Sequence, residues 1–303
     1  MSNKAIKKNI SQLDLGSYLK SLISLMKPRV MSLVIFTCAV GFLTSNPSLK
    51  TFDAIIAITL VALGSGAAGC LNMWYEADVD ALMTRTCLRP IPTGKINKQQ
   101  ALLFGILLTI FSVGTLNYFT NFLSAFLLFF TIAFYLFVYT IWLKRKTPQN
   151  IVIGGIAGSL PPVIGWTIST NSISLMPISL FLIIFFWTPS HFWALSLYKA
   201  DDYKKAKIPM MPITDGAEKT KLYILIYSLL MLPVVILPYL INFSGLLYIV
   251  PAMMLTIYYN FICYDLYKHK KNKFDLKKAK KVFGYSILYL FLIFVLFLLD
   301  YLI

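Results

Sequence analysis

The sequence is poor in acidic residues, histidine and cysteine for its length. Its 303 residues include 12 Asp and Glu, two His and four Cys. The cysteines, at positions 38, 70, 87 and 263, show no CxxC or Cys/His spacing, which argues against a disulfide framework or a zinc site. Charged residues make up 13% of the chain, against about 25% in soluble domains. This composition indicates that lipid surrounds most of the protein.

Long apolar runs make up most of the remaining sequence. The chain is 58% hydrophobic with a mean hydropathy of +0.73. A helix needs about 20 mostly apolar residues to cross a bilayer, and only helices and closed barrels satisfy the backbone there. The runs have helix length and lack the short alternating segments of a barrel. We predict an all-α polytopic membrane protein with nine spans, roughly residues 30–45, 52–72, 101–118, 122–143, 151–168, 175–197, 221–240, 245–265 and 283–302.

The net charge of +16 is distributed unevenly between the two sides of the membrane. Every basic residue except Lys50 lies before span one, or after span two, four, six or eight. The positive-inside rule places that side in the cytoplasm. The N-terminus is then cytoplasmic and, after nine crossings, the C-terminus is outside. This charge is explained by topology and by anionic lipid, so nucleic acid is not an expected partner.

The scarce acids gather at two predicted helix exits on the cytoplasmic side. Glu76, Asp78 and Asp80 follow span two, and Asp201 and Asp202 follow span six. Asn72, Glu76 and Asp80 are spaced four residues apart, so they share one face if the helix continues, while Asp78 points elsewhere. Oxygen ligands of this kind suit Mg²⁺, which combines one or two carboxylates with water and phosphate oxygens. The alternative is that these are ordinary loop charges.

The two acidic groups are separated by four spans on one side. This spacing suggests an internal duplication, with spans 1–4 and 5–8 as the two halves. Sequence identity between the halves is slight.

The motif Asn72-x₃-Glu76-x₃-Asp80 resembles the NxxxDxxxD first motif of the UbiA-type intramembrane prenyltransferases. Four longer stretches resemble the haem-farnesylating branch of that family in order and spacing, so the likeness covers essentially the whole chain. They are KPRV (27–30), NMWYEADVDALMTRTCLRPIPTGKI (72–96), LKRKTPQNIVIGGIAGSLPPVIGW (143–166) and PSHFWALSLYKADDYKKAKIPMMP (189–212). The chain departs from the pattern at Glu76, where Asp is usual, and this puts a direct metal contact there in doubt. Tyr198 and Asp202 match the second motif.

The resemblance implies a fold and a reaction. The fold is nine transmembrane helices around a central cavity, with both acidic motifs at its cytoplasmic rim. The reaction joins the farnesyl group of farnesyl diphosphate to a vinyl group of haem b. Water completes the addition, which gives haem O and releases diphosphate. Haem b is a substrate here, and Mg²⁺ is the cofactor.

The resemblance also suggests a role for particular residues. Tyr198 is expected to contact substrate, and His191, an ionisable group inside a predicted span, is expected to contact haem. His191 could instead hydrogen-bond a backbone opened by Pro189. The predicted metal ligands are Asn72, Glu76, Asp80 and Asp202, and the predicted diphosphate-binding residues are Arg85, Arg89 and Lys146.

These residues define a predicted organisation of the chain. We expect a basic cytoplasmic segment over 1–29 and one nine-helix domain over 30–303, with cytoplasmic motif loops at 73–100 and 198–220. The expected location is a bacterial inner membrane. Assembly factors of haem–copper oxidases are a further class of partner consistent with this interpretation. Rival functions are a transporter, a related enzyme with another prenyl acceptor, and a haem-binding assembly protein; the concentration of charge at the cytoplasmic ends argues against the transporter.

Overall fold

A computed structural model describes residues 14–268 and 276–303 of the protein. Residues 1–13, the first part of the predicted 1–29 segment, and residues 269–275, part of the last basic stretch, lie outside the described residues. Within the described ranges the regular structure is entirely helical. This confirms the all-α fold class.

Predicted spans two to nine correspond to helical segments whose bounds differ by at most seven residues. The first differs more, because a helix at Leu15–Leu25, inside the segment 1–29 predicted to be cytoplasmic, precedes the predicted span 30–45. Among the described residues, eight helical segments are long and apolar enough to cross a membrane, or nine if the bent pair α2–α3 is one span. The segments are α2 (Leu15–Leu25) with α3 (Pro28–Leu43), α4 (Thr51–Tyr75), α6 (Lys98–Phe119), α7 (Phe122–Ala133) with the π-helix η1 (Phe134–Leu143), α8 (Asn150–Ser159) with α9 (Pro161–Thr170), α10 (Leu175–Tyr198), α13 (Ala217–Leu240), α14 (Leu246–Lys268) and α15 (Leu276–Leu302).

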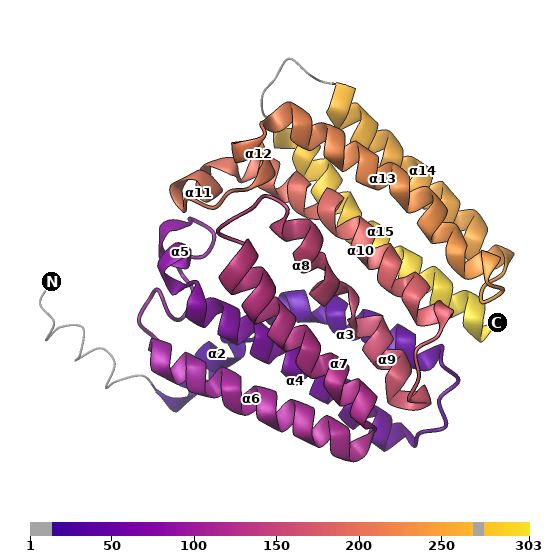
Figure 1. Ribbon diagram of the computed structural model, residues 1–303, viewed down its shortest axis with the longest axis horizontal. Helices are drawn as coiled ribbons and strands as arrows, with labels where there is room; N and C mark the ends of the chain where they lie inside the picture. The colour runs from indigo at the N-terminus through magenta and orange to yellow at the C-terminus, as the bar shows by residue number, and fades with distance from the viewer. Residues whose placement is uncertain (1–13, 269–275) are drawn as a thin grey trace, which may run out of the picture.

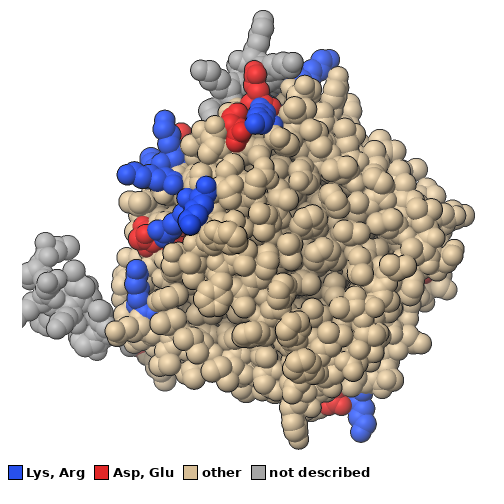
Figure 2. All heavy atoms as spheres, viewed as in Figure 1, with Lys and Arg blue, Asp and Glu red and all other residues tan. Residues whose placement is uncertain are grey.

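Three short helices lie in the two predicted motif loops. They are α5 (Ala77–Leu82), α11 (Ala200–Lys205) and α12 (Met211–Thr214). Figure 1 shows all three at the same edge of the bundle, where α4 and α10 end. Basic and acidic side chains gather along this edge in Figure 2, while most of the remaining face is uncharged. The order of a long helix, short helices and a second long helix occurs twice, as a duplicated unit would require; the duplication itself stays a prediction.

The first helical segment is sharply bent. α2 and α3 meet at an angle of 53°, and Lys27 between them has a left-handed backbone with φ 55° and ψ 54°. Pro28 begins α3, and proline disfavours an α conformation at the residue before it, so the chain leaves the helical path here. Leu15, Leu19 and Ile23 are exposed along one side of α2, at helical spacing. The bend places the Lys27 side chain beside the end of α4.

The closest helix packing is between α3 and α9. A Cβ atom added to Gly165 would overlap the carbonyl oxygen of Cys38, and one added to Gly41 would overlap that of Pro162. Both obstacles are backbone atoms, which cannot swing aside as a side-chain end can. Small residues allow such contact between membrane helices, where dispersion forces rather than water exclusion hold the pair together. The two glycines therefore set the separation of α3 and α9.

We expect Gly165→Ala to destabilise the fold by about 1–3 kcal/mol, the usual cost of overpacking, or to prevent folding altogether. Thermal unfolding in detergent measures the effect. Gly114→Ala is the matched control, because a Cβ at Gly114 in α6 has nothing within 4 Å. The control should be neutral or slightly stabilising, since alanine favours helix over glycine. Equal unfolding temperatures for the two variants would contradict this account of the α3–α9 contact.

Candidate functional site

The first motif crosses the end of α4. Asn72 lies in the last turn of α4, Glu76 at the junction, and Asp80 within α5. The helix does not continue as one piece, because Glu76 leaves the helical region with φ −92° and ψ 13°. The i to i+4 backbone bonds nevertheless persist, from Glu76 N to Asn72 O and from Asp80 N to Glu76 O. All three side chains are buried, with 2%, 2% and 3% of their surfaces exposed.

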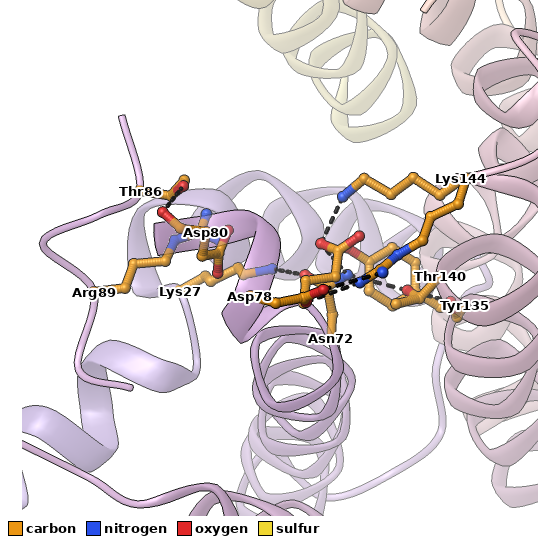
Figure 3. A network of polar contacts seen from close by, with 11 residues as sticks. Lys27, Asn72, Asp78, Asp80, Thr86, Arg89, Tyr135, Thr140 and Lys144 are labelled. Carbon is orange, nitrogen blue, oxygen red and sulfur yellow. Dashed lines mark hydrogen bonds and ion pairs between the residues drawn. The ribbon is translucent and has the colours of Figure 1, made fainter. Parts of the chain in front are cut away.

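Asn72 and Glu76 belong to one hydrogen-bonded network (Figure 3). The Asn72 Nδ2 group donates to Glu76 Oε2 at 2.9 Å and to Thr140 Oγ1 at 3.1 Å, and its Oδ1 accepts from Lys27 Nζ at 2.6 Å. Lys144 Nζ forms an ion pair with Glu76 Oε2 at 2.6 Å. The network joins α4 to the α2–α3 bend and to the end of η1.

The π-helix positions two members of this network. Thr140 Oγ1 donates to Tyr135 O at 2.8 Å, five residues back, and Lys144 N donates to Tyr139 O over the same separation. This five-residue repeat is the wider turn of a π-helix, which is rare and often occurs at functional sites. Desolvation acts to lower the pKa of Lys144, but the adjacent Glu76 carboxylate outweighs it, so the pKa is raised and the ammonium stays charged.

Asp80 and Asp78 have separate partners. Both carboxylate oxygens of Asp80 accept from Arg89 Nη1, at 2.8 and 2.7 Å. Asp78 points away from them and pairs with Arg145 at 2.9 Å, in an exposed position. Partial burial acts to raise the Asp78 pKa, but the hydrogen bonds from Arg145 help to lower it overall. The exposure of Asp78 agrees with the prediction that it faces away from the motif.

The second motif is joined to the loop that follows the first. Tyr198 is the last residue of α10, and Asp202 lies in α11, 7% exposed. Thr84, four residues after Asp80, donates its hydroxyl to Asp202 Oδ1 at 2.7 Å. Tyr198 packs edge-to-face on Phe283 with ring centroids 5.7 Å apart. The two acidic exits, four spans apart in sequence, thus meet at one edge of the bundle.

The structure brings the predicted ligands into one region without forming a closed metal cage. Among the described residues, no three Asp, Glu, His or Cys side chains lie close enough together to hold a metal by themselves. Glu76 Oε1, however, is buried without a hydrogen-bond partner. An unpaired buried carboxylate oxygen is costly and is suited to a cation. This donor set fits Mg²⁺ that takes its other ligands from phosphate and water.

The predicted basic residues differ in position. Arg89 contacts Asp80, whereas Arg85 and Lys146 are exposed. Of the basic group at 144–146, Lys144 is the residue that reaches a motif acid. Lys27, Thr84, Thr140 and Lys144 were not among the predicted site residues, although KPRV and LKRK were noted as similar to the family pattern.

His191 lies in a tight aromatic setting within α10. Its ring stacks on Trp187 at 4.3 Å and on Phe283 at 4.6 Å, and its Nδ1 lies 2.7 Å from Ser286 Oγ. Ser286 Oγ also lies 2.7 Å from Phe283 O. The direction of the His191–Ser286 bond depends on the tautomer of the ring, and Nε2 is the ring nitrogen not engaged by Ser286.

Comparison with known proteins places this fold and sequence among prenyltransferases. The model of the UbiA prenyltransferase family matches residues 33–288. A Pelagibacter ubique (strain HTCC1062) protein named protoheme IX farnesyltransferase is 69% identical over 300 residues, which cover 99% of each chain. A Parvibaculum lavamentivorans protein of the same name is 49% identical over 276 residues, which cover 91% of this chain and 87% of the relative.

Solved structures share the fold at low sequence identity. A structure of digeranylgeranylglyceryl phosphate synthase aligns with a TM-score of 0.77 at 18% identity, over 94% of this chain and 98% of that one. A UbiA homologue from Archaeoglobus fulgidus bound to DMAPP and Mg²⁺ aligns with a TM-score of 0.69 at 18% identity, over 91% and 99% of the chains.

We expect Lys144→Met to destabilise the protein by roughly 3–5 kcal/mol, because it leaves the buried Glu76 carboxylate without its counter-charge. The double variant Lys144→Met/Glu76→Gln should recover most of this loss. Arg145→Met is the matched control, since its exposed pair with Asp78 contributes less than about 1 kcal/mol. Thermal unfolding in detergent compares the variants. A double variant no more stable than Lys144→Met would show that the pair is not the cause.

Proposed function

Because the chain belongs to the UbiA prenyltransferase family, we infer that it transfers the farnesyl group of farnesyl diphosphate to a vinyl group of haem b. Diphosphate leaves from the farnesyl carbon, and water captures the cation formed beside the haem ring with loss of a proton, giving haem O. The observation that carries this function is the 69% identity, over nearly the full length of both chains, to a protein named protoheme IX farnesyltransferase. The chain is an integral membrane protein with its charged residues concentrated at one edge.

We propose that the first and second motifs bind diphosphate together with Mg²⁺. The residues that would hold the metal are Asn72, Glu76, Asp80 and Asp202. Support comes from the unpartnered Oε1 of Glu76 and from the Thr84–Asp202 bond that joins the two motif loops. When bound, Mg²⁺ supplies positive charge that stabilises the diphosphate leaving group. The extra methylene of Glu76, compared with Asp, is compatible with its reach to Lys144.

Basic side chains would bind the remaining phosphate oxygens. Arg89 and Lys144 already lie at the motif acids, and the exposed Arg85 and Lys146 stand at the same edge. An arginine guanidinium can bind phosphate through two parallel hydrogen bonds, while a lysine acts as a compact point charge. Their combined charge favours loss of diphosphate from the allylic carbon, since positioned charge is most effective where water is scarce.

The apolar helices would accommodate the isoprenoid chain and haem. Exclusion of water from this region keeps the allylic cation from early capture until the haem vinyl group attacks. Tyr198, at the end of α10 beside the second motif, is placed to contact substrate near the diphosphate. His191 would present Nε2 to haem, with its ring orientation fixed by Ser286, Trp187 and Phe283.

We also propose that the charged edge faces the cytoplasm of a bacterial inner membrane. The basic residues concentrate on that side, as the positive-inside rule requires. The N-terminus would then be cytoplasmic and the C-terminus outside. Farnesyl diphosphate would meet its phosphate- and metal-binding groups from the cytoplasmic leaflet.

The direct test is expression in a host that lacks its own haem-farnesylating enzyme. Mass analysis of extracted haem should show haem O only when this chain is present, and purified protein should release diphosphate from farnesyl diphosphate and haem b with Mg²⁺. Asp80→Asn and Asp202→Asn should lower kcat by about 10²–10³, the usual effect of losing one transition-state charge contact. Prenylation of another acceptor but not of haem b would overturn the assignment, and release unaffected by the two substitutions would overturn the site.

His191→Ala should weaken haem binding and alter the visible spectrum of bound haem. Ser286→Ala should give a smaller effect of the same kind, because loss of its hydroxyl leaves the imidazole free to carry its proton on either nitrogen. Titration of haem b into protein in detergent, followed by absorption, distinguishes the variants. Phe192→Leu is a control, because Phe192 is partly exposed beside the same histidine. Identical spectra for His191→Ala and the parent would exclude His191 as the haem contact.

A further inference from the structure

The ammonium group of Lys27 is hydrogen-bonded to Asn72 Oδ1, the one atom of the Asn72 side chain that could bind a metal. Its Nζ donates to Asn72 Oδ1 at 2.6 Å, while both N–H groups of the same amide are directed to Glu76 and Thr140. An ammonium can only donate and a carboxylate can only accept, so these partners fix which end of the amide carries oxygen. One lone pair of Oδ1 is taken by Lys27, and a cation on the other would share the atom with an ammonium 2.6 Å away, so charge repulsion disfavours metal there while Lys27 remains bound.

The charges around this bond are unequal. Three cationic side chains from three different segments, Lys27, Lys144 and Arg89, contact residues of the first motif. Lys144 and Arg89 form ion pairs with the acids, but Lys27 is bonded to a neutral amide. In the part of the chain that the structure describes, no carboxylate forms an ion pair with Lys27. Of these three cations, Lys27 is therefore the one whose partner is uncharged and can be exchanged for an incoming anion.

The backbone conformation keeps Lys27 at this place. Lys27 stands between α2 and α3 in a left-handed conformation that follows from the bend before Pro28. Its stem passes Gly69 of α4, where a Cβ would lie 3.5 Å from Lys27 Cδ. A long, flexible, unbranched side chain of this kind can exchange one partner for another without moving either helix.

We propose that Lys27 is a binding residue that couples metal to diphosphate: it covers Asn72 Oδ1 in the free protein and moves to a phosphate oxygen when diphosphate binds. This inference rests on the proposed function of the site. Mg²⁺ alone meets a covered ligand and a nearby positive charge, so it binds weakly. Diphosphate draws Lys27 away and uncovers Oδ1, so each ligand strengthens binding of the other by the same factor.

The test measures binding rather than turnover. Calorimetry on the full-length protein in detergent micelles gives the affinity for Mg²⁺ alone, and for Mg²⁺ at saturating inorganic diphosphate. In the parent protein, diphosphate should tighten Mg²⁺ binding by at least about tenfold, a coupling of typical allosteric size. In Lys27→Met, Mg²⁺ alone should bind about tenfold more tightly than to the parent, and diphosphate more weakly. The effect of diphosphate on Mg²⁺ affinity should be mostly lost in this variant.

Two further variants make the outcome decisive. Lys20→Met removes an exposed lysine of α2 and should behave as the parent. Lys27→Gln removes the charge but keeps an N–H donor for Asn72, so it should weaken diphosphate binding while Mg²⁺ alone stays weak. This variant serves if Lys27→Met fails to fold. Lys27→Met that binds Mg²⁺ alone no more tightly than the parent, or Lys27→Gln with unchanged diphosphate affinity, would overturn the proposal.

The outcome is separable from that of the enzyme assignment. If the chain forms no haem O but Mg²⁺ and inorganic diphosphate remain coupled through Lys27, the proposed acceptor is wrong and this inference stands. If haem O forms while the Lys27 variants keep the full coupling, the reaction assignment stands and the role of Lys27 is rejected.

Discussion

The whole site depends on neutralising buried acids where helices leave the bilayer. A carboxylate removed from water is tolerated only when it is paired and hydrogen-bonded. Glu76 and Asp80 meet this condition through Lys144, after η1, and Arg89, in the loop beyond α5. These partners are far apart in sequence, so satisfying the acids also ties α4 to segments that apolar contact alone would leave free to slide. Local electrostatics thus determines the architecture of one end of the bundle.

The residues that could catalyse the reaction lie at that end of the bundle, because the long helices are almost entirely apolar. The long helices offer mainly aliphatic and aromatic surface, which can hold an isoprenoid or a macrocycle but cannot activate either. Activation needs charge, and charge is concentrated at the edge where α5, α11 and α12 lie (Figure 2). The hydroxyl of Thr84 links the two motif loops there. The same edge would therefore both bind the diphosphate group of the substrate and stabilise it as the leaving group.

Sequence patterns predicted the long helices well and the local geometry of the site less well. Hydropathy determines spans because every lipid-facing helix must be apolar, so nine of them could be assigned from composition. The break at Glu76 and the bend at Lys27 depend on contacts with distant segments, which periodicity does not reveal. Lys146 is predicted to bind diphosphate, as Lys144 or Arg145 could also do, and the structure shows that Lys144 pairs with Glu76. The π-helical winding that precedes Lys144 is not visible in the hydropathy pattern.

The wide turn of η1 has an evolutionary consequence. A π-helical turn accommodates an additional residue compared with an α-helical one, and this is how a single inserted codon can be absorbed inside a helix without breaking it. Deleting one residue between Phe134 and Tyr139 without a change of winding would rotate everything downstream by roughly 100° about the axis. Thr140 and Lys144 would then lose Asn72 and Glu76 as partners. The wide turn therefore lets this segment hold an additional residue while both side chains keep their place at the site.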